Sequence, residues 1–491
     1  MQITVYTGST EKTYEAAGER NVLSFLQKHG YYIDADCGGH GFCMKCMTSI
    51  DGRMKPACLT PLKDSMIIRL PETKKQEEKK EKNISAAVDL GTTTIHVSLF
   101  NESMEKIREI SFMNPLRSFG ADVITRIEQI QHDPSLLEHM SRMITEKLIS
   151  ECAPYGILKK AIISGNTVMQ HILACIDPSS IASYPFHAKT LFREGKEQIP
   201  SLENCEVSFM PCTASYIGGD IVSGLLACDL YRRKDTCLFM DIGTNGELVL
   251  LKNGIMHACS APAGPAFEGG EISCGSSDPS HAVTHFSYCN GELSLTCACE
   301  EPSGICGSGI IDLLACLLDM ELVDETGRFT EPDEVPEKFS RYIRTDQEGN
   351  PVFTLNEKIS FTGKDLRMLQ MAGSALAAGI SVLLTETDTK PEEIDHVLLS
   401  GNFGSGIRIP SCIRTGMIPS AFLSRTAVSG NTSLKGAEMV LQNPSLLSIC
   451  RRIAEKTHYI ELSDSAVFKA QYMEFMYITE ERQWNYISRS F

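Results

Sequence analysis

Four cysteines near the start of the chain have the residue type and the spacing to hold a metal centre. Cys37, Cys43, Cys46 and Cys58 follow the pattern C-x5-C-x2-C-x11-C, and three glycines lie between the first two of them. Glycines let the backbone curl close to a cluster and aim its N–H groups at the sulfurs. Four thiolates can bind iron or zinc, but structural zinc usually sits between two paired cysteine knuckles. Three cysteines on one loop and a fourth alone favour an iron–sulfur cluster, with zinc as the alternative.

This cysteine loop resembles that of [2Fe–2S] ferredoxins of the plant and adrenodoxin type. Those families place the fourth cysteine farther downstream, but here no cysteine occurs between Cys58 and Cys152, so Cys58 takes that role. Residues 2–6 and 66–70 have the pattern of strands, and residues 21–29 have helical spacing. The resemblance implies a β-grasp ferredoxin domain over residues 1–71 that holds one [2Fe–2S] cluster.

A second chemical signal is a turn that occurs twice. Residues 85–100 read SAAVDLGTTTIHVSLF and residues 237–251 read CLFMDIGTNGELVLL. Each copy has an apolar strand, an Asp-[Leu/Ile]-Gly-Thr turn and a second strand, which is a hairpin pattern. Each is followed later by an apolar strand that ends in Ser-Gly-Asn, at 161–166 and at 396–402. The repeat predicts an internal duplication.

The residues of these turns suit phosphate. Backbone N–H groups of a Gly-Thr turn can converge on an anion, and Thr92, Thr93 and Thr94 add hydroxyls. Asp89 and Asp241, each at the end of a strand, can hold Mg²⁺ through water and orient an attacking water. One such turn alone would be an ordinary strand turn. Two copies in register predict hairpins that clamp a triphosphate from both sides.

The duplicated hairpins resemble the superfamily of acetate and sugar kinases, heat-shock chaperones and actin. The resemblance implies a duplicated ribonuclease-H-like ATPase domain, with 89–94 and 241–246 as phosphate motifs and 399–404 (LSGNFG) as the adenosine motif. Asp89 and Asp241 are the catalytic candidates, with Mg²⁺ as the metal. The residues expected to bind ATP are Gly91, Thr92, Thr93, Thr94, Gly243, Thr244, Asn245, Gly246, Gly264, Gly401, Asn402 and Gly404.

A charged segment separates the two signals. Residues 72–83 read ETKKQEEKKEKN, with no large apolar residue, and predict a solvated, flexible linker. Three further segments follow: ATPase subdomains at 84–235 and 236–440, and a C-terminal segment at 441–491 expected to pack back on the ATPase domain. Cys297 and Cys299 lack two further nearby cysteines, so a second metal site is not expected there.

Composition narrows the class of protein. The chain has 491 residues, which suggests two to four domains, and a net charge of −16, which argues against nucleic-acid and anionic-membrane partners. No run of 18 apolar residues occurs, and the first residues lack a signal-peptide pattern. Nineteen cysteines without an export signal are read as free thiols plus a metal centre. We therefore expect a soluble, cytoplasmic protein.

A ferredoxin domain followed by an ATPase of this type resembles the reductive activators of corrinoid proteins. The resemblance implies ATP-dependent transfer of one electron that converts Co(II) to Co(I), a corrinoid protein partner, a low-potential electron donor and a homodimer. Some members have an extra middle domain, and only a short linker is expected here. The stretches that carry the resemblance are 114–127, 164–173, 218–226, 241–248, 263–270, 304–315 and 460–468.

Three other functions remain open from the sequence. An activator of the 2-hydroxyacyl-CoA dehydratase type would hold a [4Fe–4S] cluster within its ATPase domain, which the N-terminal cysteine set disfavours. A small-metabolite kinase with a fused redox-sensing ferredoxin domain would transfer phosphoryl groups to a metabolite. A chaperone-like nucleotide switch would leave the ferredoxin domain without a use.

Overall fold

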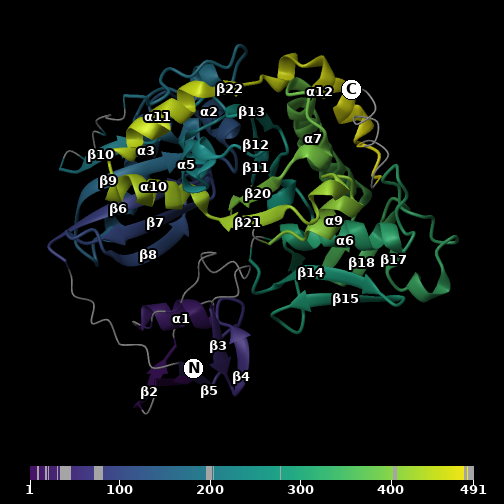
Figure 1. The fold of residues 1–491 in the computed structure, drawn as a ribbon. Helices are drawn as coiled ribbons and strands as arrows, with labels where there is room; N and C mark the ends of the chain where they lie inside the picture. The colour runs from purple at the N-terminus through teal and green to yellow at the C-terminus, as the bar shows by residue number, and fades with distance from the viewer. Residues whose placement is uncertain are drawn as a thin grey trace.

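The computed structural model of the protein describes most of residues 1–491. The residues outside the description are 8–9, 17–18, 20, 30, 32, 34–45, 71–80, 195–198, 200–201, 203, 277, 402–405, 480–483 and 485–491. The described strands form five separate sheets. Figure 1 shows two large sheets with helices around them, short strands at the lower right, and a small N-terminal sheet below.

The N-terminal sheet has the strand order β2-β1-β5-β3-β4, in which β1 and β5 are parallel. Alternate residues of β1 and β5 are buried, because successive side chains of a strand point to opposite faces. Helix α1 (Val22–Lys28) begins after the N-cap Asn21 and packs Phe25 and Leu26 into the same core. The predicted strands and helix are confirmed. The strands are β1 (Gln2–Thr7), β2 (Thr10–Glu15), β3 (Met47–Ile50), β4 (Arg53–Pro56) and β5 (Met66–Leu70).

The first large sheet has the order β10-β9-β6-β7-β8. Strands β6, β7 and β8 form an antiparallel meander, and β6 also pairs in parallel with β9, so that Asp89 lies opposite Ser164. The strands are β6 (Asn83–Leu90), β7 (Thr94–Phe100), β8 (Lys106–Met113), β9 (Ile157–Gly165) and β10 (Glu206–Phe209). Three helices accompany this sheet: α2 (Val123–His132), α3 (Leu136–Cys152) and α4 (Thr167–Leu173).

The second large sheet repeats this arrangement, in the order β21-β20-β11-β12-β13-β22. Its meander is β11, β12 and β13, and β11 pairs in parallel with β20, so that Asp241 lies opposite Ser400. Asp89 and Asp241 thus have equivalent positions in the two sheets. The strands are β11 (Cys237–Ile242), β12 (Gly246–Lys252), β13 (Ile255–Ala261), β20 (His396–Ser400), β21 (Thr426–Gly430) and β22 (Thr457–Tyr459).

Two helices join the sheets. Helix α5 (Gly219–Ala227) packs against α10 (Thr432–Gln442), and α10 also contacts β6. Their apolar side chains share one core with Phe239 of the second sheet and Ile162 of the first. A Cβ at Gly436 would lie 2.3 Å from the carbonyl oxygen of Ser223, so the helices can approach this closely only with glycine there. Helix α10 extends across residue 440, where the sequence predicted a boundary.

The remaining helices and strands surround the second sheet. Helix α12 packs along α7, and β22 pairs with β13 at the edge of the sheet. The helices are α6 (Gly307–Asp319), α7 (Gly363–Glu386), α9 (Ile409–Arg414), α11 (Leu446–Lys456) and α12 (Ala466–Glu474). The short strands are β14 (Ala282–Cys289), β15 (Glu292–Cys297), β16 (Gly304–Ile305), β17 (Ile343–Thr345), β18 (Pro351–Asn356) and β19 (Ile359–Phe361).

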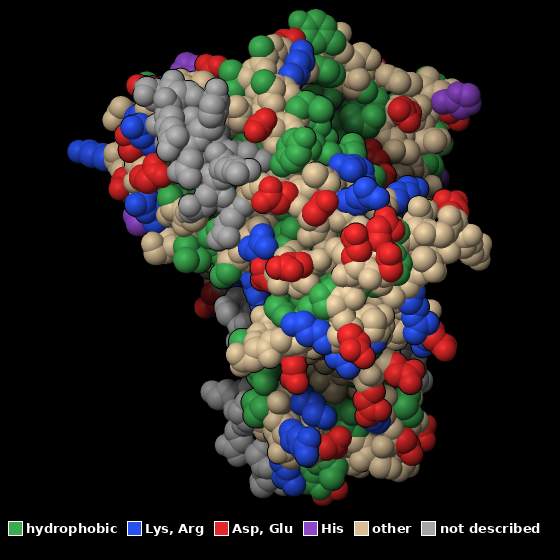
Figure 2. Space-filling view, turned by 90° about the vertical axis from the view of Figure 1, so that its right-hand side faces the viewer, with side chains coloured by type: hydrophobic (Ala, Val, Ile, Leu, Met, Phe, Trp, Pro, Cys, Tyr) green, Lys and Arg blue, Asp and Glu red, His purple; other side chains and the backbone are tan. Residues whose placement is uncertain are grey.

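Helix α7 is long and apolar enough to cross a membrane by length and composition, with a mean hydropathy of 1.6. Its apolar window is 83% buried inside the molecule, however, which is typical of a core helix. On the face shown in Figure 2, acidic and basic side chains are interspersed, and neither sign of charge dominates.

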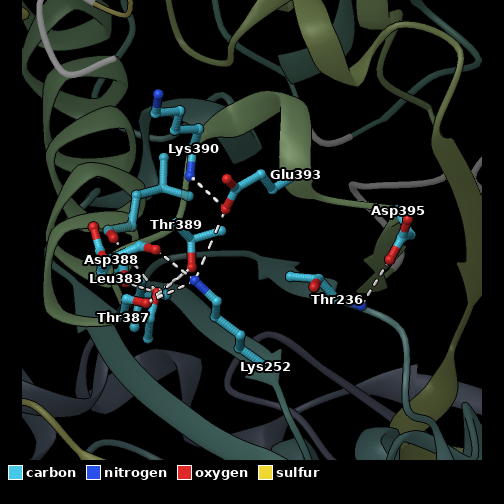
Figure 3. A network of polar contacts seen from close by, with 10 residues as sticks. Thr236, Lys252, Leu383, Thr387, Asp388, Thr389, Lys390, Glu393 and Asp395 are labelled. Carbon is cyan, nitrogen blue, oxygen red and sulfur yellow. Dashed lines mark hydrogen bonds and ion pairs between the residues drawn. The ribbon is translucent and has the colours of Figure 1, made fainter. Parts of the chain in front are cut away.

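Lys252, at the end of β12, ties this strand to the end of α7. Its Nζ donates hydrogen bonds to the carbonyl oxygens of Thr387, at 3.0 Å, and Asp388, and lies 3.8 Å from Glu393 Oε2 (Figure 3). A cation stabilises the carbonyls at a helix C-terminus. The side chain is only 24% exposed, so these bonds are poorly replaced by water.

Replacing Lys252 by methionine keeps the aliphatic stem and removes the ammonium group. We expect the free energy of unfolding to fall by about 1–2 kcal/mol, measured by urea denaturation. The matched control is Lys358→Met, because Lys358 lies 4.0 Å from Glu301 on the surface and both side chains are exposed. That change should cost less than about 0.5 kcal/mol. Equal losses in the two variants would contradict the capping role of Lys252.

Candidate functional site

A cavity of about 290 Å³ lies between the two large sheets. The turns of both predicted phosphate motifs line it, together with residues from the helices and loops that join the sheets. The structure therefore brings together residues that are about 150 positions apart in the sequence. The sequence-predicted residues that line the cavity are Asp89, Gly91, Thr92, Thr93, Thr94, Asp241, Gly243, Thr244, Asn245 and Gly401.

The other predicted ATP-binding residues have different places. Gly246 lies within β12, where a Cβ would be 3.0 Å from the side chain of Leu376, so it packs against α7 and does not line the cavity. Gly264 has a φ of +70° beside the cavity wall formed by Phe267 and is also not among the lining residues. Asn402 and Gly404 lie outside the described residues.

The side chains of Asn114 and Arg126 hold the first hairpin turn in place through its carbonyl groups. Asn114 Nδ2 donates to the carbonyl oxygen of Gly91 at 2.7 Å, and the fully buried Arg126 donates from Nη2 to the carbonyl of Thr92 at 2.8 Å. A Cβ at Gly91 would lie 2.4 Å from the carbonyl oxygen of Thr94, so this tight turn requires glycine. A turn held this way keeps its N–H groups preorganised for an anion.

The second hairpin meets the predicted adenosine motif. Asp241 Oδ2 accepts a hydrogen bond from Ser400 Oγ at 2.9 Å. Gly401 has a φ of +82°, and a Cβ there would lie 2.7 Å from Asp241 Oδ1. The Ser-Gly pair at the end of β20 therefore lets the chain turn directly beside the carboxylate of Asp241.

Glu268 bridges the two hairpins. Thr244 Oγ1 donates to Glu268 Oε1 at 3.0 Å, and Thr93 Oγ1 lies 3.4 Å from Glu268 Oε2. The two hydroxyls belong to opposite phosphate motifs, so one carboxylate spans the cleft where phosphate oxygens are expected. Burial raises the pKa of Glu268 above its usual range.

Three residues that the sequence analysis did not assign to the site form hydrogen bonds with Asp89 or Thr92. Ser433 Oγ donates to Asp89 Oδ1 at 2.7 Å, and Asn431 Nδ2 donates to Oδ2 at 2.8 Å. Asn166 Nδ2 donates to Thr92 Oγ1 at 3.1 Å. Asn166 and Asn431 are the N-caps of α4 and α10, and both stand in the string Ser-Gly-Asn-Thr. This string at 164–167 and 429–432 was the signal that could have found them.

Carboxylates gather at the floor of the cavity and shift one another's titration. Burial, with repulsion from Asp241 and Asp89, raises the pKa of Asp220 to about 8. Burial raises the pKa of Asp241 to about 6, although the Ser400 hydrogen bond opposes the change. Burial, with repulsion from Asp220 and Asp241, raises the pKa of Glu247 well above its usual range. Among the described residues, no group of three possible metal ligands stands together here, so a Mg²⁺ ion in this cavity would take one or two carboxylates, with water and phosphate oxygens completing its coordination.

Magnesium binding at this cluster should therefore depend on pH. A cation that ligates Asp220 would displace its proton, so in that case we expect Mg²⁺ to bind about tenfold more tightly per pH unit between pH 6 and pH 8. Calorimetric titration of Mg²⁺ with ADP in two buffers would measure both the affinity and the protons released. Asp220→Asn should remove most of the pH dependence. Asp177→Asn is the control, since Asp177 pairs with Lys189 on the surface; equal slopes in both variants would contradict the assignment.

The same raised pKa values make the stability of the cation-free protein depend on pH. Carboxylates whose pKa is raised by folding stabilise the folded state below the unfolded pKa of about 3.9. This contribution is lost as the pH rises through about 6 for Asp241 and about 8 for Asp220. Occupation of the cluster by Mg²⁺ should reverse the loss.

Two of the predicted cluster ligands are placed by the structure. Cys46 precedes β3 and Cys58 follows β4, and both side chains are buried, with their Sγ atoms 3.1 Å apart. Asn21 Nδ2 donates to the Cys58 carbonyl at 2.8 Å, and the Ala57 N–H donates to the Cys46 carbonyl at 2.9 Å. Two buried thiols this close need to separate only slightly to ligate one metal ion, because metal–sulfur bonds of about 2.3 Å in tetrahedral geometry place the sulfurs about 3.8 Å apart. Cys37 and Cys43 lie outside the described residues, and no group of three possible metal ligands occurs among those described.

Comparison with known families identifies the class of protein. Residues 235–488, more than half of the chain, match the C-terminal domain of RACo, the ASKHA domain. Residues 84–233 match the RACo middle region. The chain therefore belongs to the RACo family. The middle region begins at residue 84, directly after the charged segment 72–83.

Individual relatives agree with the family. The chain is 26% identical over 422 residues to the corrinoid activation enzyme RamQ of Eubacterium limosum, covering 81% of this chain and 70% of the relative. It is also 26% identical to a [Co(II) methylated amine-specific corrinoid protein] reductase of Methanosarcina barkeri, over 57% of this chain and about half (53%) of that relative. A solved reductive activator for a corrinoid, iron–sulfur protein matches with a TM-score of 0.71 and 25% identity, over 97% of this chain and 98% of that one.

Proposed function

We propose that this protein is an ATP-dependent reductive activator that transfers one electron to the cobalt of a corrinoid protein and converts Co(II) to Co(I). The observation that carries the proposal is that one chain combines buried, adjacent thiols in an N-terminal module with a carboxylate-lined cleft between two sheets. Its relatives are named for the reduction or activation of corrinoid proteins.

The N-terminal module, residues 1–71, is proposed to be a β-grasp ferredoxin domain. A five-stranded sheet with one helix across it supports this proposal. Cys37, Cys43, Cys46 and Cys58 would hold a [2Fe–2S] cluster, and such a cluster supplies one electron at a time at low potential. The chain's part is to bury Cys46 and Cys58 in the module core and to exclude water from them.

The cleft is proposed to bind ATP with Mg²⁺. The backbone and hydroxyls of Thr92 and Thr244, which line the cavity, would hold the phosphates, and Asp89 and Asp241 would hold the cation and orient a water. Equivalent positions of the two aspartates in sheets of the same topology support an internal duplication of the fold. Glu268 would be displaced from Thr93 and Thr244 when phosphate arrives, which would couple occupancy to the geometry of the cleft.

Nucleotide binding can supply energy of the right size. An acceptor about 100 mV below its donor adds about 2.3 kcal/mol to the transfer of one electron. Coupling between two ligand sites in a protein is typically about 1–3 kcal/mol. A nucleotide-dependent change in how the corrinoid partner is held can therefore suffice without contact between nucleotide and cobalt.

The test is an anaerobic assay. Pre-reduced protein is mixed with a Co(II) corrinoid protein from the same cell, and the absorbance of Co(I) is followed with and without ATP. We expect Co(I) to accumulate at a rate or to an extent that depends on ATP. Absence of Co(I) together with phosphorylation of a small metabolite would replace this proposal by the kinase alternative.

The other parts of the proposal concern the setting of the reaction. The protein is proposed to work in the cytoplasm, to receive electrons from a low-potential donor, and to form a homodimer. Light scattering after size-exclusion chromatography would test the dimer, and a monomer at micromolar concentration would contradict it.

A further inference from the structure

Two cysteines outside the proposed cluster site lie side by side at the end of a hairpin. Strands β14 and β15 form this hairpin, and Cys297 is the last residue of β15. The chain bends at Ala298 and Cys299, directly after the strand. The Sγ atoms of Cys297 and Cys299 are 3.1 Å apart, and the N–H of Cys299 points at Cys297 Sγ, 3.4 Å away.

The residue between them contacts the N-terminal module. Ala298 packs against the apolar core that contains Phe25, Ile68 and the buried Cys46 and Cys58. Figure 1 shows the β14–β15 hairpin reaching down beside this module. A change of backbone geometry between the two cysteines would therefore alter the contact of Ala298 with the N-terminal module.

The surroundings of the pair suit thiol chemistry better than metal binding. Both side chains are partly exposed, so a small reagent can reach them. Among the described residues, no third His, Cys, Asp or Glu completes a metal site with them. Burial, and then the hydrogen bond with the Cys297 thiol, raises the pKa of Cys299 to about 11, which slows attack by the Cys299 thiolate but does not change the position of the exchange equilibrium with a disulfide in the surroundings.

We propose that Cys297 and Cys299 are a two-electron dithiol that exchanges with low-molecular-weight disulfides, and that its redox state alters the packing of Ala298 on the N-terminal module. One cysteine thiolate attacks the disulfide RSSR, forms a mixed disulfide and releases one thiolate RS⁻. The second cysteine thiolate then attacks the protein sulfur, closes the Cys297–Cys299 bond and releases the second RS⁻. The two cysteine protons end on the two released thiols, and RSSR takes up two electrons.

The bond requires little movement. The two sulfurs must approach from 3.1 Å to about 2.05 Å, which rotation about the side-chain bonds and a small tightening of the turn at Ala298 can supply. Exposed disulfides of this kind are easily reduced again. The inference does not depend on the corrinoid partner or on ATP, because it concerns thiols that neither proposed site uses.

The sequence allows a direct test. Cleavage after Glu292 and Glu300 releases Leu293–Glu300 (LSLTCACE), which contains no other cysteine. Full-length protein, purified without air, is equilibrated with mixtures of glutathione and its disulfide and quenched in acid. It is then digested, and the mass of the released peptide is measured by mass spectrometry. We expect the peptide to become lighter by two hydrogens, from one tenth to nine tenths oxidised over about an 80-fold change in [GSSG]/[GSH]². A peptide that stays a dithiol, or carries only glutathione adducts, overturns the proposal.

Variants of single cysteines show whether this pair, and not another thiol, is responsible for the loss of two hydrogens. Cys297→Ser and Cys299→Ser should abolish the two-hydrogen loss, while Cys289→Ser, at the exposed end of β14 in the same hairpin, should leave it unchanged. Hydrogen exchange then tests the contact: amides of α1 and of strands β3 and β5 should exchange several-fold differently in the two redox states of the native protein, and identically in Cys297→Ser. Exchange that ignores the redox state would overturn the link to the N-terminal module.

Discussion

Replacement of Asp241 by asparagine should abolish ATP turnover. The side-chain oxygen of asparagine can still accept the hydrogen bond from Ser400, so the turn after β20 is retained. The variant loses the negative charge that would hold the cation and orient the water, and groups in such roles contribute about 10²–10⁴-fold to a rate. We therefore expect phosphate release to fall by at least about 100-fold.

The measurement must separate the cleft from the cysteine site. Phosphate release and the visible spectrum of the N-terminal module are recorded on the same preparation, and the spectrum should not change. Asp177→Asn, which alters a surface carboxylate paired with Lys189, is the matched control and should keep its turnover. Turnover of Asp241→Asn within a few-fold of the unchanged protein would remove Asp241 from the proposed catalytic role.

Replacement of Cys58 by alanine should eliminate the metal centre of the N-terminal module. Cys58 is 1% exposed and its Sγ lies 3.1 Å from that of Cys46, so no water or neighbouring side chain can enter easily as a substitute ligand. We expect bound iron and labile sulfide to fall close to background and electron transfer to cobalt to cease. ATP turnover should persist, because the cleft lies in other parts of the chain.

A matched cysteine variant controls for general damage. Cys450→Ser changes an equally buried thiol in the core shared by the large sheets, far from the N-terminal module in sequence. It should keep its iron even if it loses stability. An intact cluster in Cys58→Ala would refute the ligand assignment and would reopen the question of which thiols bind the metal.

The sequence predicted the parts of the cleft that depend on local patterns. The Asp-x-Gly-Thr turns were recognisable because a tight hairpin needs glycine, as the close approach of Gly91 to Thr94 demonstrates. The alternation in residues 2–6 and the strand-like run at 66–70 likewise predicted strands, and in both strands alternate residues are buried. These features are determined by neighbours in the chain, so a single sequence suffices to find them.

Residues brought to the cleft from a distance could not be predicted in this way. Glu268 is the last residue of the short 3-10 helix Pro265–Glu268 and contacts both hairpins only when the sheets are packed together. Asp220 lies at the start of α5, and its pKa is raised by burial and then by repulsion from Asp241 and Asp89, which belong to two different strands. Gly246 stands in the Gly-Thr-Asn-Gly string that suggested phosphate, but its neighbour in space is Leu376.

The first turn of α10 gives the cleft a fixed pivot. Asn431 and Ser433 bind Asp89 of the first sheet, while the hydroxyl of the intervening Thr432 bonds to Ser400 of the second. Both sheets are thus bound to α10, and the contact between the two hairpins, from Thr93 to Glu268, is the long one at 3.4 Å. Relative motion of the sheets should therefore be rotation about α10 and not separation. In a rotation, displacement grows in proportion to the distance from the axis, so a small change at the phosphates becomes a larger one at the periphery, and the molecule acts as a lever.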